Sequence, residues 1–246
     1  MRGLTIGMVV ACVAGSASAD LLWNNGPLVT NPGAGAGGAD ASAISPGQGT
    51  FGGAYNNATF RLAEDFTVTG GGWNITSMEF FGYQTGSTTT SSFTGLFVQI
   101  WNGTPGEGGS VVWGDMTTNL LSSSAFTNIY RVTSTTLTNT QRPVMSLVAS
   151  GLDINLGNGA YWVEFATTGS LASGPWCPLV SDPVAPIIGN ARQFTVSTGV
   201  WANAVDGANG LGYALPFIVN GTVVPAPGAL ALLGLAGLAG GRRRRD

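Results

Sequence analysis

The composition of the chain changes at Phe60, and this change constrains the fold most. From there on, short β-branched and aromatic runs alternate with turn residues rich in Gly, Asn and Pro, and no stretch up to the C-terminal tail shows a helical period. The runs predict strands at 62–69, 75–84, 94–101, 129–137, 144–149, 160–167, 193–197 and 213–219. Many short strands with few helices predict an all-β fold, a two-sheet antiparallel sandwich of jelly-roll type.

Alternation within two of these runs divides each predicted strand into two faces. Val98 and Ile100 fall on one face of their run, and Phe97, Gln99 and Trp101 fall on the other. In the run that holds Trp162, the pattern places Trp162 and Glu164 opposite the apolar residues Tyr161, Val163 and Phe165.

The N-terminus has the layout of a cleavable signal peptide over residues 1–19. A basic residue precedes an apolar stretch, and Ala17 and Ala19 supply the small residues that signal peptidase accepts before Asp20. A buried N-terminal helix is one alternative, although the stretch is too short for a bilayer span. A lipid-attachment box ending at Cys12 is another, but it lies early and the better cleavage site follows it.

The C-terminus, residues 223–246, combines three features in a fixed order. A short proline motif, Pro225-Ala226-Pro227, precedes an apolar and Gly-rich stretch, which is followed by the basic cluster Arg242, Arg243, Arg244 and Arg245. The apolar stretch as a helix would be about 24 Å long, short of the ~30 Å hydrocarbon core. Adjacent arginines resist translocation, so the pattern indicates a membrane stop with the basic end in the cytoplasm.

This order resembles the PEP-CTERM protein-sorting domain, whose motif is Pro-Glu-Pro where this chain has alanine at the centre. The resemblance covers residues 223–246. It implies a flanking hydrophobic helix that anchors the protein transiently in the inner membrane, processing by an exosortase, a membrane transpeptidase, and delivery to the cell surface or to extracellular polysaccharide. A permanent single-pass transmembrane helix is the alternative.

The predicted organisation is therefore a signal helix at 1–19, an irregular Gly/Ala/Ser-rich segment at 20–59, a β-sandwich at 60–222 and the sorting tail. The run Gly33 to Gly38 matches the dinucleotide-binding fingerprint in letters only, because it follows no strand and opens no helix.

Charge excludes several classes of function. The chain has no lysine and no histidine, and residues 20–224 hold four arginines against eleven carboxylates, a net charge of about −7. So little positive charge argues against nucleic-acid binding. The absence of histidine excludes Ser-His-Asp and Cys-His catalysis and histidine-bearing metal sites. We expect no cofactor.

Two further chemistries depend on carboxylates and amides. Glycoside hydrolysis needs only a pair of carboxylates, and the chain offers six candidates: Glu64, Asp65, Glu79, Asp115, Asp153 and Glu164. Asp153, Asn155 and Asn158 beside a Gly-rich turn are weak calcium candidates, since turn stabilisation explains these residue types as well.

Seven tryptophans are many for a domain of this size. Most fall in or beside predicted strands, where packing is the expected role. Trp176 differs, because the run Pro175-Trp176-Cys177-Pro178 forms a stiff loop, and Trp176 is our candidate for stacking on a ligand. Cys177, the only cysteine after the signal peptide, is expected to be buried and unreactive.

The leading hypothesis is thus a non-catalytic, exported envelope or extracellular-matrix protein of structural or adhesive type. The alternatives are a secreted carbohydrate-binding sandwich and a secreted glycan-active enzyme.

The sorting signals predict the mature ends of the chain. Intact mass of the protein recovered from its host should correspond to a chain that begins at Asp20 and ends near Pro225, because signal peptidase and the transpeptidase each remove one end. Recovery of a soluble intracellular chain that retains both Met1 and Asp246 would contradict the export hypothesis.

Overall fold

The computed structural model describes residues 19–224 as a β-rich domain with one short 3-10 turn. Most of the predicted signal peptide, residues 1–18, and the tail from Pro225 lie outside the described residues, and so do both predicted flanking helices. Within residues 19–224, no helix has the length and apolar character needed to cross a bilayer. The elements are β1 (Asp20–Asn24), η1 (Ala36–Gly38), β2 (Asp40–Ala43), β3 (Gly52–Ala54), β4 (Phe60–Val68), β5 (Trp73–Gly82), β6 (Phe93–Trp101), β7 (Val111–Asp115), β8 (Ser123–Val132), β9 (Pro143–Leu156), β10 (Gly159–Gly169), β11 (Trp176–Pro178), β12 (Arg192–Thr195), β13 (Val200–Asn203) and β14 (Phe217–Val223).

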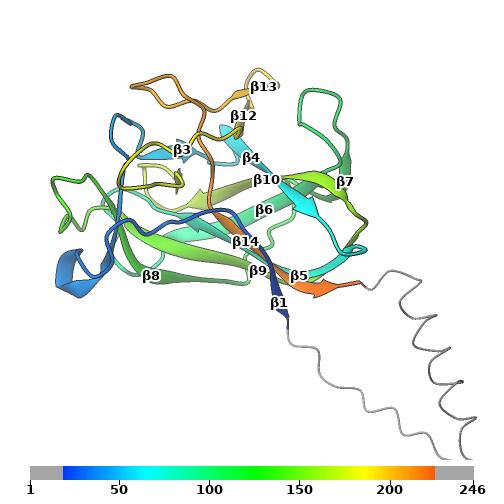
Figure 1. The fold of residues 1–246 in the computed structure, drawn as a ribbon, viewed down its shortest axis with the longest axis horizontal. Coiled ribbons are helices and arrows are strands. Elements are labelled where there is room, and N and C mark those ends of the chain that lie inside the picture. The colour runs from blue at the N-terminus through cyan, green and yellow to red at the C-terminus, as the bar shows by residue number, and fades with distance from the viewer. Residues whose placement is uncertain (1–18, 225–246) are drawn as a thin grey trace, which may run out of the picture.

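The strands form two six-stranded sheets that pack as a sandwich, with a small third sheet beside them (Figure 1). Sheet 1 has the order β1-β14-β5-β9-β8-β2, and sheet 2 has the order β13-β12-β4-β10-β6-β7. The third sheet pairs β11 with β3. Neighbouring strands are antiparallel except β2 and β8, which run parallel. The prediction of an all-β, sandwich-like architecture with antiparallel sheets is confirmed.

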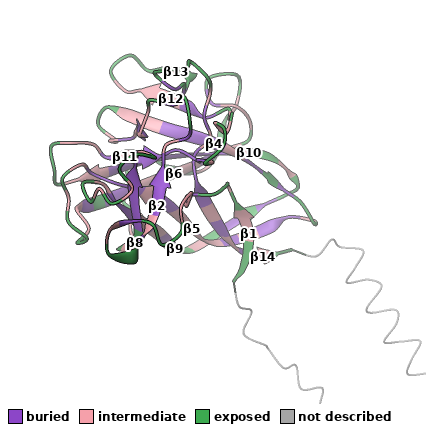
Figure 2. Ribbon diagram, turned by 60° about the vertical axis from the view of Figure 1, so that its left-hand side comes forward, coloured by how far each residue is buried: buried purple, intermediate pink, exposed green. Residues whose placement is uncertain are grey.

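The core lies between the two large sheets, where the buried residues concentrate (Figure 2). Val98 and Ile100 are fully buried there, on one face of their strand as the alternation predicts, while Trp162 and Glu164 lie on the outer face of sheet 2. Phe80 of sheet 1 packs 4.7 Å from Phe165 of sheet 2, measured between ring centroids. Aromatic contacts of this kind join the sheets. The described residues contain no disulfide that could do so.

The prediction that residues 20–59 are irregular is wrong in part. This segment contributes β1 and β2, the two edge strands of sheet 1, and also β3. These strands are short, and β2 and β3 are built of small residues, so no apolar period marks them; backbone hydrogen bonding to a neighbour defines them instead. The sequence patterns also missed β7, β11 and β13, and placed the start of β8 six residues late.

Both ends of the described chain leave the sandwich at one corner. β1 pairs antiparallel with β14, with Asp20 opposite Gly221 (Figure 1). Ala19 and Asp20, two of the predicted cleavage residues, are exposed at the start of β1. Segments that precede β1 and follow β14 therefore attach to the same end of the molecule.

The packing of Phe80 predicts a large stability loss on truncation. Phe80→Ala should lower the free energy of unfolding by ~3–5 kcal/mol, because it removes a fully buried ring and leaves a cavity between the sheets. Val184→Ala, at a side chain that is 81 % exposed, is the control and should change stability by less than ~0.5 kcal/mol. Urea denaturation measures both; similar losses in the two variants would contradict this account of the core.

Candidate functional site

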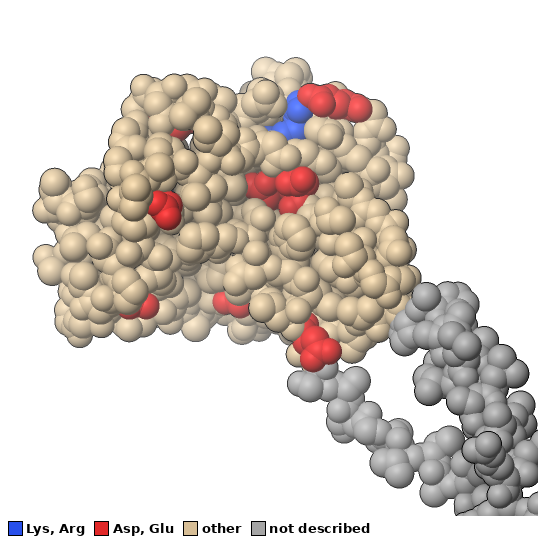
Figure 3. All heavy atoms as spheres, in the orientation of Figure 1, with Lys and Arg blue, Asp and Glu red and all other residues tan. Residues whose placement is uncertain are grey.

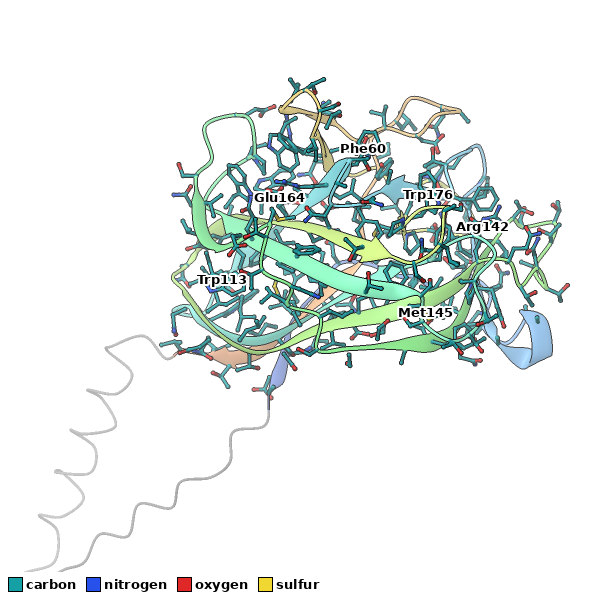
Figure 4. The ribbon with its side chains drawn as sticks, turned by 180° about the vertical axis from the view of Figure 1, so that it is seen from behind. Phe60, Trp113, Arg142, Met145, Glu164 and Trp176 are labelled. Atoms are coloured by element: carbon teal, nitrogen blue, oxygen red, sulfur yellow. The ribbon has the colours of Figure 1, made fainter. Side chains whose placement is uncertain are left out.

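Trp176 lines a pocket at one end of the sandwich, where Arg142 also lies (Figure 4). The pocket has a volume of about 240 Å³. We call it the Trp176 pocket, and its lining residues are Phe51, Gly52, Tyr83, Thr85, Arg142, Ser173 and Trp176. The elements that supply them are far apart in the sequence, so only the fold brings them together.

The backbone holds Trp176 firmly in place. Its N–H donates to the Tyr83 carbonyl at 3.0 Å, and the Tyr83 N–H donates back to the Trp176 carbonyl at 2.9 Å. On its other side, β11 pairs Trp176 with Ala54 of β3. Gly174 has a φ of +89°, and a Cβ there would lie 2.5 Å from the indole, so this position requires glycine. The indole itself is half-buried, which leaves part of it available to a ligand.

The opposite wall consists of an arginine stacked on a phenylalanine. The Arg142 guanidinium carbon lies 4.1 Å from the centre of the Phe51 ring. Arg131 supports both residues, because its Nε donates to the Phe51 carbonyl at 2.7 Å and its backbone N–H donates to the Arg142 carbonyl at 2.9 Å. Arg131 therefore holds the Phe51 half of the wall through its side chain and the Arg142 half through its backbone.

Arg131 is itself unusual, because it is a fully buried cation. Its Nη1 donates to the hydroxyls of Ser42 and Ser181, at 3.0 and 2.7 Å. Its Nη2 has no hydrogen-bond partner among the described residues. Burial lowers the pKa of Arg131 to about 10, so the guanidinium keeps its charge at neutral pH.

A larger cavity of about 580 Å³ lies at the outer face of sheet 2. Trp162 and the ion pair between Arg192 and Glu107 contribute to its lining. Next to it on the same face, Glu164 is almost completely buried and accepts hydrogen bonds from Arg61, Gln99 and Trp101 at 3.4, 2.5 and 2.9 Å. Burial raises the pKa of Glu164, and these donors oppose the rise. Each arginine on this face has a carboxylate partner, so the cavity is balanced in charge.

The six candidate catalytic carboxylates do not meet in a cavity. The two cavities above and a third one, of about 270 Å³ and without acidic lining residues, contain a single carboxylate between them, that of Glu107. Glu64 lies inside the sandwich, where it accepts a hydrogen bond from the Leu215 N–H at 2.6 Å. Burial raises its pKa to about 8, so it is largely protonated at neutral pH.

The three calcium candidates are engaged with protein groups. Asp153 and Asn155 both accept from Asn74, at 2.6 and 3.0 Å, on neighbouring strands of sheet 1. Asn158 instead accepts from the Gly71 N–H of a nearby turn at 2.9 Å. Within residues 19–224, no three His, Cys, Asp or Glu side chains cluster as a metal site would require.

The sequence patterns identified only one residue of the Trp176 pocket. Trp176 was singled out as a candidate, whereas Phe51, Tyr83 and Arg142 were not. The signal in the sequence that points to Arg142 is the scarcity of basic residues, because each arginine in so acidic a domain is a candidate for a specific role. Cys177 is fully buried, as expected, and the sorting residues from Pro225 to Arg245 lie outside the described residues.

Comparison with known proteins gives no assignment: no family model, no curated protein and no solved structure matches this chain. Its function must therefore be argued from its own residues. The best basis is the Trp176 pocket, which joins aromatic walls, hydroxyls and a cation in one concave surface.

The protonated Glu64 predicts a pH-dependent stability. The unfolded chain loses this proton near the ordinary pKa of 4.5, whereas the folded chain holds it up to about pH 8. The stability contributed by this group is complete below pH ~4.5 and is lost as the pH rises toward ~8. Glu64→Gln keeps an acceptor for Leu215 but cannot ionise. From pH ~5 to ~8, the wild type should lose on the order of 2–5 kcal/mol more than the variant in urea denaturation. Parallel pH profiles would show that Glu64 is ionised in the fold.

Proposed function

We propose that this chain is an exported, non-catalytic cell-surface protein of adhesive type, which holds extracellular polysaccharide in the Trp176 pocket. Signal peptidase and an exosortase-like transpeptidase are its partners during export. The binding domain is a sandwich of jelly-roll type, and the PEP-CTERM-like tail is its transient membrane anchor.

The placement of the pocket is the observation that carries this proposal. β1 and β14 end together at one corner of the domain, and Trp176 and Arg142 lie toward the opposite end (Figures 1 and 4). A domain attached through either end would direct the pocket away from the attachment point. This orientation suits a protein that is held at a membrane while it contacts material outside the cell.

The lining chemistry suits a sugar. Aromatic rings such as those of Trp176 and Phe51 offer flat apolar faces for the C–H groups of a pyranose, and a pocket of this kind needs only a few polar groups for orientation. Tyr83, Thr85 and Ser173 add hydroxyl groups to the lining.

Most of the surface suits an extracellular, hydroxyl-rich environment. The face shown in Figure 3 is largely uncharged, and blue basic atoms appear at one place, next to red acidic atoms. A protein with few charges and many Ser, Thr and Asn side chains interacts with water and with polysaccharide through neutral hydrogen bonds. The lack of a carboxylate pair in the cavities described above supports binding without hydrolysis.

Removal of the indole tests the binding surface. Trp176→Ala should weaken retention of the full chain on the host's extracellular polysaccharide by about two- to twelvefold, because loss of one stacking ring costs ~0.5–1.5 kcal/mol. Affinity electrophoresis in gels that contain the polysaccharide measures the change. Trp201→Ala is the matched control, since Trp201 is also half-buried but packs against Trp101 and Phe194 at sheet 2.

Wild-type migration that is unaffected by the polysaccharide would overturn the proposed function. Equal retardation of the wild type and Trp176→Ala would place the binding surface elsewhere.

A further inference from the structure

The described domain has four arginines, and they divide into two pairs with opposite surroundings. Arg61 forms an ion pair with Glu164, and Arg192 forms one with Glu107. No carboxylate of residues 19–224 lies within ion-pair distance of Arg131 or Arg142. Both unpaired arginines belong to the Trp176 pocket or its supporting wall.

This arrangement is unexpected in an acidic domain. Residues 20–224 contain eleven carboxylates, nearly three for each arginine, and two of them pair with Arg61 and Arg192. A buried cation without a counter-ion is costly. The fold nevertheless keeps Arg131 fully buried next to Arg142, with one terminal nitrogen lacking any partner among the described residues. The positive charge of this region is therefore available to a group that is not part of the domain.

We propose that the Trp176 pocket selects an anionic sugar residue, whose carboxylate or sulfate group pairs with Arg142. This inference rests on the proposed function and specifies the class of polysaccharide that the pocket takes.

The stacking of Arg142 leaves its donors free for such a group. A guanidinium that lies over an aromatic ring uses its face for the ring, while its N–H groups point outward in its own plane. No side-chain hydrogen bond of Arg142 occurs among the described residues. The fork geometry of these donors matches a carboxylate or a sulfate better than a single hydroxyl.

Arg131 acts behind the pocket as a positioning residue. It fixes the Phe51 carbonyl and the Arg142 carbonyl, and thus the two halves of the stacked wall. Burial raises the pKa of Tyr83, and the charges of Arg131 and Arg142 oppose this rise. Both guanidinium charges therefore act at a side chain that lines the pocket, where burial outweighs them.

The size of the pocket limits the ligand. A volume of about 240 Å³ is below the ~300–1,000 Å³ of sites that enclose a whole drug-sized ligand. The pocket therefore accommodates one residue of a polysaccharide, with the rest of the polymer outside. Trp176 would contact the ring of this residue, and Arg142 its acidic substituent.

The test compares acidic and neutral oligosaccharides by isothermal titration calorimetry, with the full chain in detergent. The probes are oligogalacturonate, the neutral galactose oligomer of equal length, and a sulfated galactose oligomer. We expect at least one acidic probe to bind about tenfold or more tightly than the neutral one, because hydrogen bonds to ionised groups are roughly twice as strong as neutral ones. The better acidic probe distinguishes carboxylate from sulfate as the source of the charge.

The variant Arg142→Gln should weaken binding of the acidic probe about tenfold or more and so remove the preference for the acidic over the neutral probe. Arg61→Gln removes the same charge from the outer face of sheet 2 and should retain the preference for the acidic probe. The wild type provides a measurement that does not depend on variant folding: added salt should weaken acidic binding far more than neutral binding.

Equal affinity of the wild type for acidic and neutral probes, or no salt dependence of acidic binding, would overturn this inference and leave the proposed function intact. Failure of all three probes and of the host's own polysaccharide to bind would overturn both.

Discussion

Burial of apolar side chains between two sheets is the constraint on which the rest of the structure depends. The described residues contain one cysteine and no disulfide, so packing must offset the conformational entropy of the ordered chain. Phe80, Phe165 and Phe217 join sheet 1 to sheet 2 at the centre of this core. The long loops and the short edge strands are held only because this core provides a fixed surface for them.

The buried charge of Arg131 then decides how the loops at one end are arranged. From β8 it bonds to Ser42 of β2, to Ser181 after β11 and to the Phe51 carbonyl before β3. One side chain thus joins three segments that are far apart in the sequence. The Trp176 pocket forms where these segments meet, which connects the stability of this end with the proposed binding of an anionic sugar.

The two ends of the domain therefore have different roles in the proposed function. The corner formed by β1 and β14 is where the predicted sorting segments would join the domain, and the opposite end carries the pocket. In the cavity at sheet 2 the Arg192 charge is paired with Glu107, and the Glu64 carboxyl in the core accepts a hydrogen bond from the Leu215 N–H. Only the Trp176 pocket combines exposed aromatic surface with unpaired positive charge among the cavities described.

The sequence by itself determined the all-β architecture and the division of strands such as β6 and β10 into two faces, because period-two alternation is a local property of the chain. It also excluded histidine chemistry and pointed to Trp176, through a proline-flanked loop. Only the tertiary structure decided that β1, β2 and β3 are strands, because all three are short, β2 and β3 are built of small residues without an apolar period, and their pairing partners are distant in sequence. The tertiary structure also decided which arginines lack a carboxylate partner, since ion pairing depends on distances that no local pattern encodes.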